Sequence, residues 1–484
     1  MNVSRFRMIT CFAFCCSIFG SALAWQTSPA DHSTRRIYVE PFVTKQGSEK
    51  FREDVVAGLR KLNSVSLARD ESNADVILGG GGEVWIKGYR SHNPQLGNPL
   101  PNGTPIYTGF LSIELKDRNG ETLWSYLATP PASSRDISKD LSALIVKKLA
   151  EALEQGGAPS LTAPLRQPTT HLSGAGATFP FPVYEKWFTN YRRENPALEI
   201  RYEPTGSTAG VRSLLSNNVD FGASDSPEVI HELSPSDEEK YLFFPSVAGA
   251  VVPVVNLPGM SGDIAFTPEA LAGIYLGKIK KWNDPILTRA NRGLRLPDLD
   301  IVVVHRGDGS GTSYAWTDYL SKTSPEWKAQ VGTSLTPKWP VGREVNGNEG
   351  VSKLVKEQSG SIGYVEFIYA LQNHLSYGRV RNRSGEFVPA SLESIAAAVS
   401  HSTKISRDFK VSIVDAQGEG VYPISSFTWI VVPAHIVDDA KRNALTSFLR
   451  WMAGPAQRQA AALGYLPIPK DVATEEEAAI ARIH

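Results

Sequence analysis

The sequence predicts an α/β protein preceded by a small α+β domain, and three observations support this prediction. The chain has 484 residues, which corresponds to roughly three domains at about 150 residues each. Residues 155–170, QGGAPSLTAPLRQPTT, are rich in Gly, Pro, Ser and Thr without hydrophobic periodicity, which is typical of an exposed linker. After this linker, glycine-rich loops open two amphipathic helices in quick succession. We therefore expect the chain to divide at the linker.

The first 24 residues have the features of a secretory signal peptide. Arg5 and Arg7 precede an apolar run over residues 8–23, which ends in the small-x-small pattern Ala22-Leu23-Ala24. Cleavage after Ala24 is predicted, so the mature protein is expected in a bacterial periplasm. The three cysteines all lie inside the apolar run, and the mature chain would have neither a thiol nor a disulfide: Cys11, Cys15 and Cys16.

The composition argues against several classes of partner. Fifty basic and fifty acidic residues balance, so nothing indicates binding to nucleic acid or to an anionic membrane surface. The nine histidines show no paired-ligand spacing, and no mature cysteine could assist them. We expect neither a metal site nor a cofactor, and no later segment has the length of a transmembrane helix.

Residues 25–154 are expected to fold as the small α+β domain. Hydrophobic patterns predict strands at 35–42, 74–89, 107–117 and 121–128 and helices at 49–62 and 140–155. This β-α-β-β-β-α order favours an α+β fold. Gly79 to Gly82 lack the Lys-Ser/Thr of a phosphate loop, so we expect a bulge or tight bend there. The partner of this domain is not evident from its sequence.

Three glycine-rich segments after the linker are placed to open helices. In the first helix, Val183, Trp187, Phe188 and Tyr191 share one face, and in the second, Ser207 is placed to cap the N-terminus. The third segment is HRGDGSGTSYAW, residues 305–316. Glycines and hydroxyls at helix N-termini favour anion binding, although a stretch of this kind is also an ordinary loop with a Ser or Thr N-cap.

Two nucleotide-binding alternatives fit less well. Gly174-Ala175-Gly176 could begin a dinucleotide fingerprint, with Glu203 as the ribose-binding acid, but Phe179 stands where the third glycine belongs and two prolines follow. A Walker A loop is excluded at residues 309–313 because these contain no lysine.

Eight blocks from residue 170 onward resemble one known family in order and spacing. They are GAGATFPFPVYEKW, YEPTGSTAGV, NNVDFGASDSP, IYLGKIKKWNDP, HRGDGSGTSYAWTDYL, KWPVG, GSIGYVEF and YPISSFTWI. The chain resembles the PstS family, the periplasmic phosphate-binding proteins of phosphate ABC transporters. The resemblance implies a two-lobe periplasmic-binding-protein fold of type II with a hinge. Lobe I would comprise residues 171–255 and 423–484, and lobe II residues 256–422, with crossovers near 250–259 and 422–433.

The same resemblance implies a set of phosphate-binding residues. Thr178 and Ser207 would each give a hydroxyl and an N–H, Phe179 an N–H, and Arg306 a guanidinium oriented by Asp308. Asp225 would accept a hydrogen bond from a protonated phosphate oxygen. Further donors would come from the third helix entrance: Ser310, Gly311 and Thr312.

The chemistry of these residue types agrees with phosphate. Phosphate still carries a proton at neutral pH and sulfate does not, and an ionised carboxylate such as Asp225 can only accept hydrogen bonds. Asp225 would therefore favour phosphate and repel sulfate. Arg306 suits the positive role because its planar fork matches two oxygens.

The resemblance implies a phosphate receptor, not an enzyme, that delivers phosphate to the permease subunits of an ABC importer. An alternative is a phosphate-responsive periplasmic sensor or envelope-organising protein acting through residues 25–154. A phosphatase is disfavoured, because no metal ligands are recognisable and no general base is placed near Ser310 or Thr178.

Overall fold

In the computed structural model, the described residues are 35–44, 50–62, 65–91, 103–118, 120–130, 136–154, 170–260, 263–402 and 408–484. The predicted signal peptide, residues 1–24, and residues 155–169 of the predicted linker lie outside this set. Among the described residues no helix is long and apolar enough to cross a membrane.

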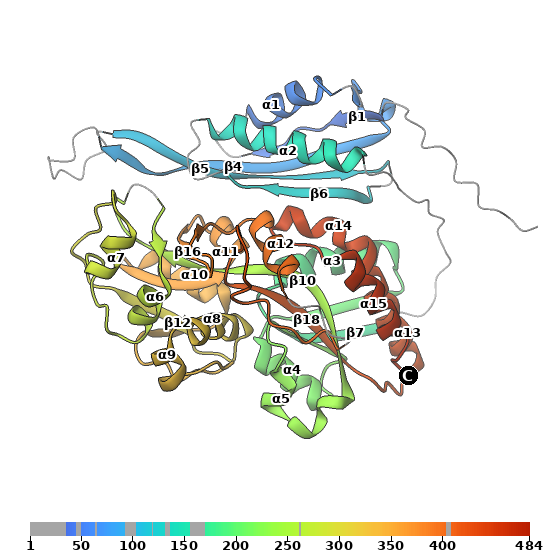
Figure 1. Ribbon diagram of the computed structural model, residues 1–484. Helices are drawn as coiled ribbons and strands as arrows, with labels where there is room; N and C mark the ends of the chain where they lie inside the picture. Colours follow the sequence, from blue (N-terminus) through green and yellow to red (C-terminus); the bar gives the residue numbers. More distant parts are fainter. Residues whose placement is uncertain are drawn as a thin grey trace, which may run out of the picture. The chain divides into compact units, whose positions relative to one another are not determined.

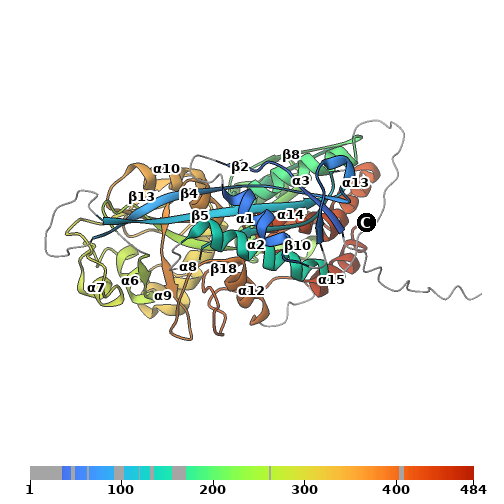
Figure 2. The same cartoon turned by 90° about the horizontal axis from the view of Figure 1, so that it is seen from above.

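The α+β domain is a mixed sheet with two helices. Its elements are β1 (Arg35–Val39), β2 (Val43–Thr44), α1 (Lys50–Leu59), β3 (Val65–Leu67), η1 (Glu71–Asn73), β4 (Val76–Ser91), β5 (Gly103–Lys116), β6 (Thr122–Ala128) and α2 (Ile137–Glu154). The strand order is β3-β1-β4-β5-β6, with β2 beside β4. Helices α1 and α2 lie side by side over one face of the sheet (Figures 1 and 2). The short strands β2 and β3 were not predicted from the sequence.

The expectation of a bulge or tight bend at Gly79 to Gly82 is wrong. All four glycines lie inside β4 and pair in unbroken register with residues 111–114 of β5. A Cβ at Gly79 would meet the Glu40 carboxylate at 1.8 Å, and one at Gly81 would meet the Val43 carbonyl oxygen at 2.7 Å. The glycines therefore allow neighbouring segments to approach the sheet closely.

The second α/β part begins at β7 and contains one continuous nine-stranded sheet. Its strands are β7 (Thr170–Gly176), β8 (Leu198–Glu203), β9 (Phe221–Ser224), β10 (Tyr241–Val255), β11 (Ala265–Phe266), β12 (Val302–Arg306), β13 (Arg343–Val345), β14 (Ser361–Glu366), β15 (Ser376–Tyr377), β16 (Arg379–Arg381), β17 (Phe387–Val388) and β18 (Ser425–Pro433). The sheet order is β13-β12-β14-β10-β18-β9-β7-β8, with β15 beside β10 and a separate small sheet β11-β16-β17.

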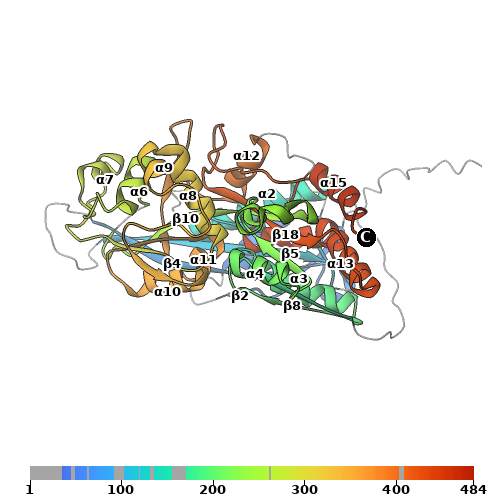
Figure 3. The ribbon, with the colours of Figure 1, turned by 90° about the horizontal axis from the view of Figure 1, so that it is seen from below.

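Helices surround this sheet (Figures 1 and 3). They are α3 (Phe181–Glu194), α4 (Ser207–Leu215), α5 (Val229–Leu233), α6 (Pro268–Tyr275), α7 (Pro285–Ala290), α8 (Gly311–Thr323), α9 (Pro325–Gln330), α10 (Gly347–Glu357), α11 (Phe367–Gln372), α12 (Leu392–Ser400), α13 (Asp439–Trp451), α14 (Gln457–Ala460) and α15 (Lys470–Ile480). Shorter turns are η2 (Pro235–Lys240), the π-helical η3 (Met452–Ala456) and η4 (Ala461–Leu463).

Strand β10 connects the two lobes. Its first half pairs with β18, and its second half pairs with β14 and β15 of lobe II. The outgoing strand β10 and the returning strand β18 are direct neighbours, with Ala250 opposite Ser425. Two adjacent extended crossings form a hinge about which lobes of this type close.

The α+β domain contacts both lobes. In lobe I, the Ser112 hydroxyl donates to the Ala462 carbonyl (2.9 Å), and the Ser125 hydroxyl donates to the Arg458 carbonyl (2.5 Å). In lobe II, His374 Nε2 lies 2.9 Å from a Glu83 carboxylate oxygen. The α+β domain is thus packed against both lobes.

Candidate functional site

The N-terminal ends of α4, α8 and α10 and the loop before α3 meet where the two lobes touch. We call the residues that the sequence analysis selected there the interlobe site: Thr178, Phe179, Ser207, Asp225, Arg306, Asp308, Ser310, Gly311 and Thr312. The Thr208 N–H of lobe I donates to the Gly309 carbonyl of lobe II at 3.1 Å. The lobes are therefore in direct contact at this site.

The structure corrects the role of Ser207 at the start of α4. The N-cap is Gly206, whose φ of 93° suits a residue without a side chain. A Cβ there would also lie 2.6 Å from an Asp308 carboxylate oxygen. The Ser207 hydroxyl is consequently not a cap. It accepts the N–H of Gly311 of lobe II at 3.0 Å, so this N–H, predicted to donate to the anion, already has a protein acceptor.

Ser310 caps helix α8, as in an ordinary loop, and also keeps a hydroxyl proton that could bind an anion. Its hydroxyl oxygen caps α8 by accepting the Ser313 N–H at 3.1 Å. An N-cap interaction uses only an oxygen lone pair, and the hydroxyl proton stays available for donation. Ser310 is 1 % exposed, so any acceptor of that proton would also be shielded from water.

Four buried backbone N–H groups at the site make no hydrogen bond with the described residues. They belong to Thr178, Phe179, Ser207 and Thr312. Buried backbone donors are nearly always satisfied, so a group of free ones needs an explanation. Helix entrances with free N–H groups bind anions.

Arg306 supplies the positive charge. It lies at the end of β12 with its side chain 1 % exposed and forms an ion pair with Asp308. Nε of Arg306 donates to Asp308 at 2.6 Å, and Nη1 lies 3.4 Å from the Thr178 hydroxyl of the other lobe. Asp308 is held in turn by the Gly347 N–H at 3.2 Å. Asp308 thus fixes the guanidinium with one nitrogen directed at lobe I.

Asp225 is a buried carboxyl group with several donors around it. The Thr428 hydroxyl donates to it at 2.6 Å, and the carboxyl is 1 % exposed. Burial raises the pKa of Asp225 to about 7, although the hydrogen bonds from Thr428 and Thr312 and the charge of Arg306 oppose the shift. An ionised Asp225 was expected from the sequence. Here the neutral and ionised forms coexist near neutral pH.

Asn348 is a further residue of the site that was not predicted from the sequence. Its Nδ2 lies 2.9 Å from the Thr178 hydroxyl of lobe I and 3.4 Å from the Thr312 hydroxyl of lobe II, and it is fully buried. Its Oδ1 accepts the Glu366 N–H at 3.0 Å. Gly347 before it has a φ of 69°. The segment NGNEG, residues 346–350, is a further glycine-rich helix entrance and could have been selected on that ground.

No group of three or more His, Cys, Asp or Glu side chains that could hold a metal ion occurs among the described residues. The charges at the interlobe site come from one arginine and two carboxyl groups. With the free N–H groups and hydroxyls, this donor set suits a tetrahedral oxyanion that brings a proton of its own.

Comparison with known proteins gives consistent results. A profile of the PBP superfamily domain matches residues 160–456. The phosphate-binding protein PstS of Xylella fastidiosa is 42 % identical over 325 residues, covering 66 % of this chain and 88 % of that protein. PstS of Haemophilus influenzae is 41 % identical over 303 residues, covering 62 % and 90 %.

Solved structures support the same fold. A high-affinity periplasmic phosphate-binding protein bound with phosphate superposes with a TM-score of 0.52 at 20 % identity, covering 64 % of this chain and 93 % of that one. The phosphate-binding protein of Stenotrophomonas maltophilia gives 0.50 at 20 % identity. The aligned share leaves roughly the first third of the chain without a counterpart.

Proposed function

This chain belongs to the PstS family of phosphate-binding proteins within the PBP superfamily, and from this premise we propose that it binds inorganic phosphate at the interlobe site and delivers it to an ABC importer. The observation that carries the proposal is the group of four free N–H donors next to one buried arginine. Such a group is unfavourable unless an anion satisfies it.

Each residue of the interlobe site has a role in this proposal. The N–H groups of Thr178, Phe179, Ser207 and Thr312 donate to phosphate oxygens, the Ser207 and Ser310 hydroxyls add donors, and Arg306 supplies charge. The Thr312 hydroxyl donates to Asp225. The Thr178 hydroxyl oxygen accepts from Arg306 and Asn348, so its own O–H donates a hydrogen bond to a ligand oxygen. Gly311 acts through Ser207, and Asp308 through Arg306.

Asp225 gives the site its selectivity for phosphate. Carboxyl group and anion share one proton in the complex, so either of them can bring it. An ionised Asp225 accepts a hydrogen bond from the O–H of HPO₄²⁻, whereas sulfate has no O–H to donate and meets an unfavourable charge. Because the pKa of Asp225 is about 7, we propose that rejection of sulfate is strongest above neutral pH.

We propose that the protein is a periplasmic, non-enzymatic receptor whose closed lobes dock on the permease subunits of the importer. Relatives named phosphate-binding protein PstS support a binding role over the sensor or phosphatase alternatives. A chain that keeps the predicted signal peptide but lacks residues 25–169 should still support phosphate uptake if transport is the function, whereas a sensor acting through the α+β domain would lose its output.

Equilibrium dialysis of the mature chain against radiolabelled phosphate tests the proposal. We expect one phosphate per chain and a loss of binding in Arg306→Ala. The control Arg289→Ala removes an exposed arginine of α7 in the same lobe and should bind normally. Equal binding by both variants would contradict the proposed site.

A further inference from the structure

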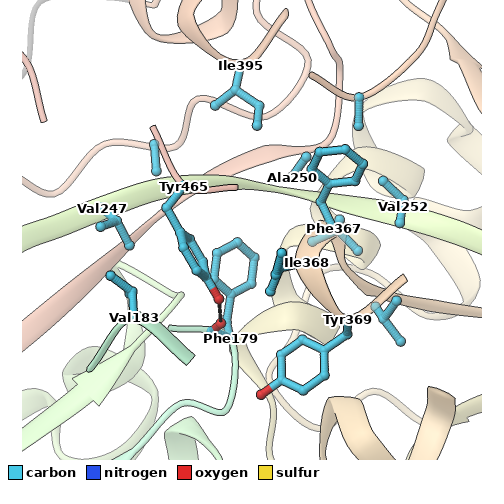
Figure 4. Close-up of a cluster of buried hydrophobic side chains, with 14 of the residues drawn as sticks. Phe179, Val183, Val247, Ala250, Val252, Phe367, Ile368, Tyr369, Ile395 and Tyr465 are labelled. Carbon is cyan, nitrogen blue, oxygen red and sulfur yellow. Dashed lines mark hydrogen bonds between the residues drawn. The ribbon is translucent and has the colours of Figure 1, made fainter. Parts of the chain in front are cut away.

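Three consecutive carbonyl groups in the loop before α3 each accept a tyrosine hydroxyl. Tyr202 donates to Ala177 at 2.8 Å, Tyr369 donates to Thr178 at 2.8 Å, and Tyr465 donates to Phe179 at 2.6 Å. Figure 4 shows the bond between Tyr465 and Phe179, with Tyr369 close by. The tyrosines come from β8, from α11 and from the segment after η4.

Each of these carbonyl groups shares a planar peptide unit with the nitrogen of the next residue, so a hydrogen bond to the carbonyl also orients an N–H group on that nitrogen. In a planar trans peptide the carbonyl of one residue and the N–H of the next point in opposite directions. Tyr202 therefore fixes the direction of the Thr178 N–H, and Tyr369 fixes that of the Phe179 N–H. These are two of the four N–H groups without a protein acceptor at the interlobe site.

The tyrosines differ in the lobe that carries them. Tyr202 and Tyr465 belong to lobe I, as does the loop that they hold, whereas Tyr369 lies in α11 of lobe II. The contact between Tyr369 and Thr178 can therefore form only while the lobes are together. Within lobe I, the Thr178 carbonyl accepts just one longer bond, from the Phe181 N–H at 3.3 Å.

We propose that Tyr369 is a positioning residue for ligand binding: its hydroxyl reaches across from lobe II, holds the Thr178 carbonyl and aims the Phe179 N–H at the bound anion when the lobes close. This inference rests on the proposed function and adds a residue that does not touch the ligand. Burial also raises the pKa of Tyr369, so the hydroxyl remains a donor throughout the physiological pH range.

Release kinetics of the full chain test the proposal. Tyr369→Phe keeps the ring and removes only the hydroxyl, so we expect phosphate to dissociate roughly three- to tenfold faster, the effect of about one hydrogen bond. Association should change little, because the contact forms after encounter. Tyr319→Phe is the matched control: Tyr319 is fully buried in lobe II and donates to the Arg381 carbonyl at 2.9 Å, away from the loop.

A spectroscopic measurement separates positioning from general loosening. In full-length protein labelled with ¹⁵N-phenylalanine, phosphate should move the Phe179 amide proton downfield, and this shift should be smaller in Tyr369→Phe but normal in Tyr319→Phe. An unchanged dissociation rate and an unchanged Phe179 shift in Tyr369→Phe would overturn the inference. Absence of phosphate binding in the wild-type chain would instead overturn the proposed function.

A second substitution keeps the test decisive if Tyr369→Phe does not fold. Incorporation of 3-fluorotyrosine at position 369 gives a more acidic hydroxyl that donates more strongly. Phosphate should then dissociate more slowly than from the wild-type chain. Equal or faster dissociation from this folded protein would contradict the role of Tyr369.

Discussion

The interior of the α+β domain and the interlobe site are both buried, but the first is lined by apolar side chains and the second by polar and charged groups. The domain buries side chains such as Ile37, Phe51, Leu111 and Leu141 completely, and this apolar contact stabilises the fold. The interlobe site buries an arginine, a carboxyl group, hydroxyls and free N–H groups. Buried polar groups cost stability unless they are satisfied. The α+β interior thus has the composition of a folding core, whereas the interlobe site has the composition that we propose for phosphate binding.

Arg306→Ala should give the largest effect and sharpen this contrast. It removes a buried charge and leaves Asp308 without its partner, a change that typically costs about 3–5 kcal/mol. When the phosphate complex is destabilised by this free energy relative to the ligand-free chain, phosphate affinity drops by roughly two to four orders of magnitude. Titration calorimetry measures the affinity, and a thermal unfolding scan checks that the variant is folded. A drop of less than about tenfold would break the assignment of Arg306.

Leu141→Ala, in the α+β domain, should lower the folding stability and leave the phosphate affinity nearly unchanged. Leu141 is fully buried in α2, and such a truncation costs about 2–5 kcal/mol of folding free energy. Urea unfolding should show this loss, while phosphate affinity at 25 °C stays within about twofold of wild type. A large change in affinity would mean that the two interiors are coupled.

The preference for phosphate over sulfate should depend on pH through Asp225. Its pKa of about 7 leaves it neutral at pH 5.5, when it can donate to sulfate, and ionised at pH 8.5, when it cannot. Sulfate affinity should therefore fall by up to about tenfold per pH unit above pH 7. In Asp225→Asn the side chain donates at every pH, so the fall should vanish. Competition titrations with both anions measure this effect, and a flat wild-type profile would contradict it.

Glu476→Gln should give the smallest effect, in the interior of lobe I. Neither carboxylate oxygen of Glu476 has a hydrogen-bond partner among the described residues, and burial raises the pKa of Glu476 well above the usual value. A raised carboxyl pKa contributes stability below the unfolded value, near 4.3, and that stability is lost as the pH rises. Glu476→Gln should therefore be more stable than wild type at pH 8, by about 1 kcal/mol or more, and the gain should shrink toward pH 5.

The control for that experiment is the neighbouring residue on α15. Glu477 is exposed and pairs with Arg450 at 2.7 Å, so Glu477→Gln should show no gain at pH 8 in urea unfolding. A gain in both variants would indicate a general charge effect and not the burial of Glu476.

Local sequence patterns predicted many of the helices, strands and helix entrances correctly. The features that they did not predict depend on contacts between segments distant in the sequence. The strand and helix order of the α+β domain and the helix entrances were recognisable because hydrophobic periodicity and glycine-hydroxyl clusters are local. The fold of the lobes followed from a resemblance. Tyr369 and the close contacts of Gly79 to Gly82 were not recognisable, because each acts on a segment distant in the sequence. Ser207 was assigned as a cap for the same reason: its true partner, Gly311, lies 104 residues away. Asn348 did carry a local signal, the glycine-rich helix entrance at residues 346–350.

Titration calorimetry of the mature chain, freed of bound ligand by partial unfolding and refolding, tests the central claim most directly. Phosphate and sulfate are titrated separately at pH 8 into the wild-type chain and into the Asp225→Asn variant. We expect binding of one phosphate per chain and no measurable sulfate binding by the wild-type chain, with sulfate binding gained in the variant. No heat from either anion with the refolded wild-type chain would contradict the claim that the interlobe site is a phosphate site.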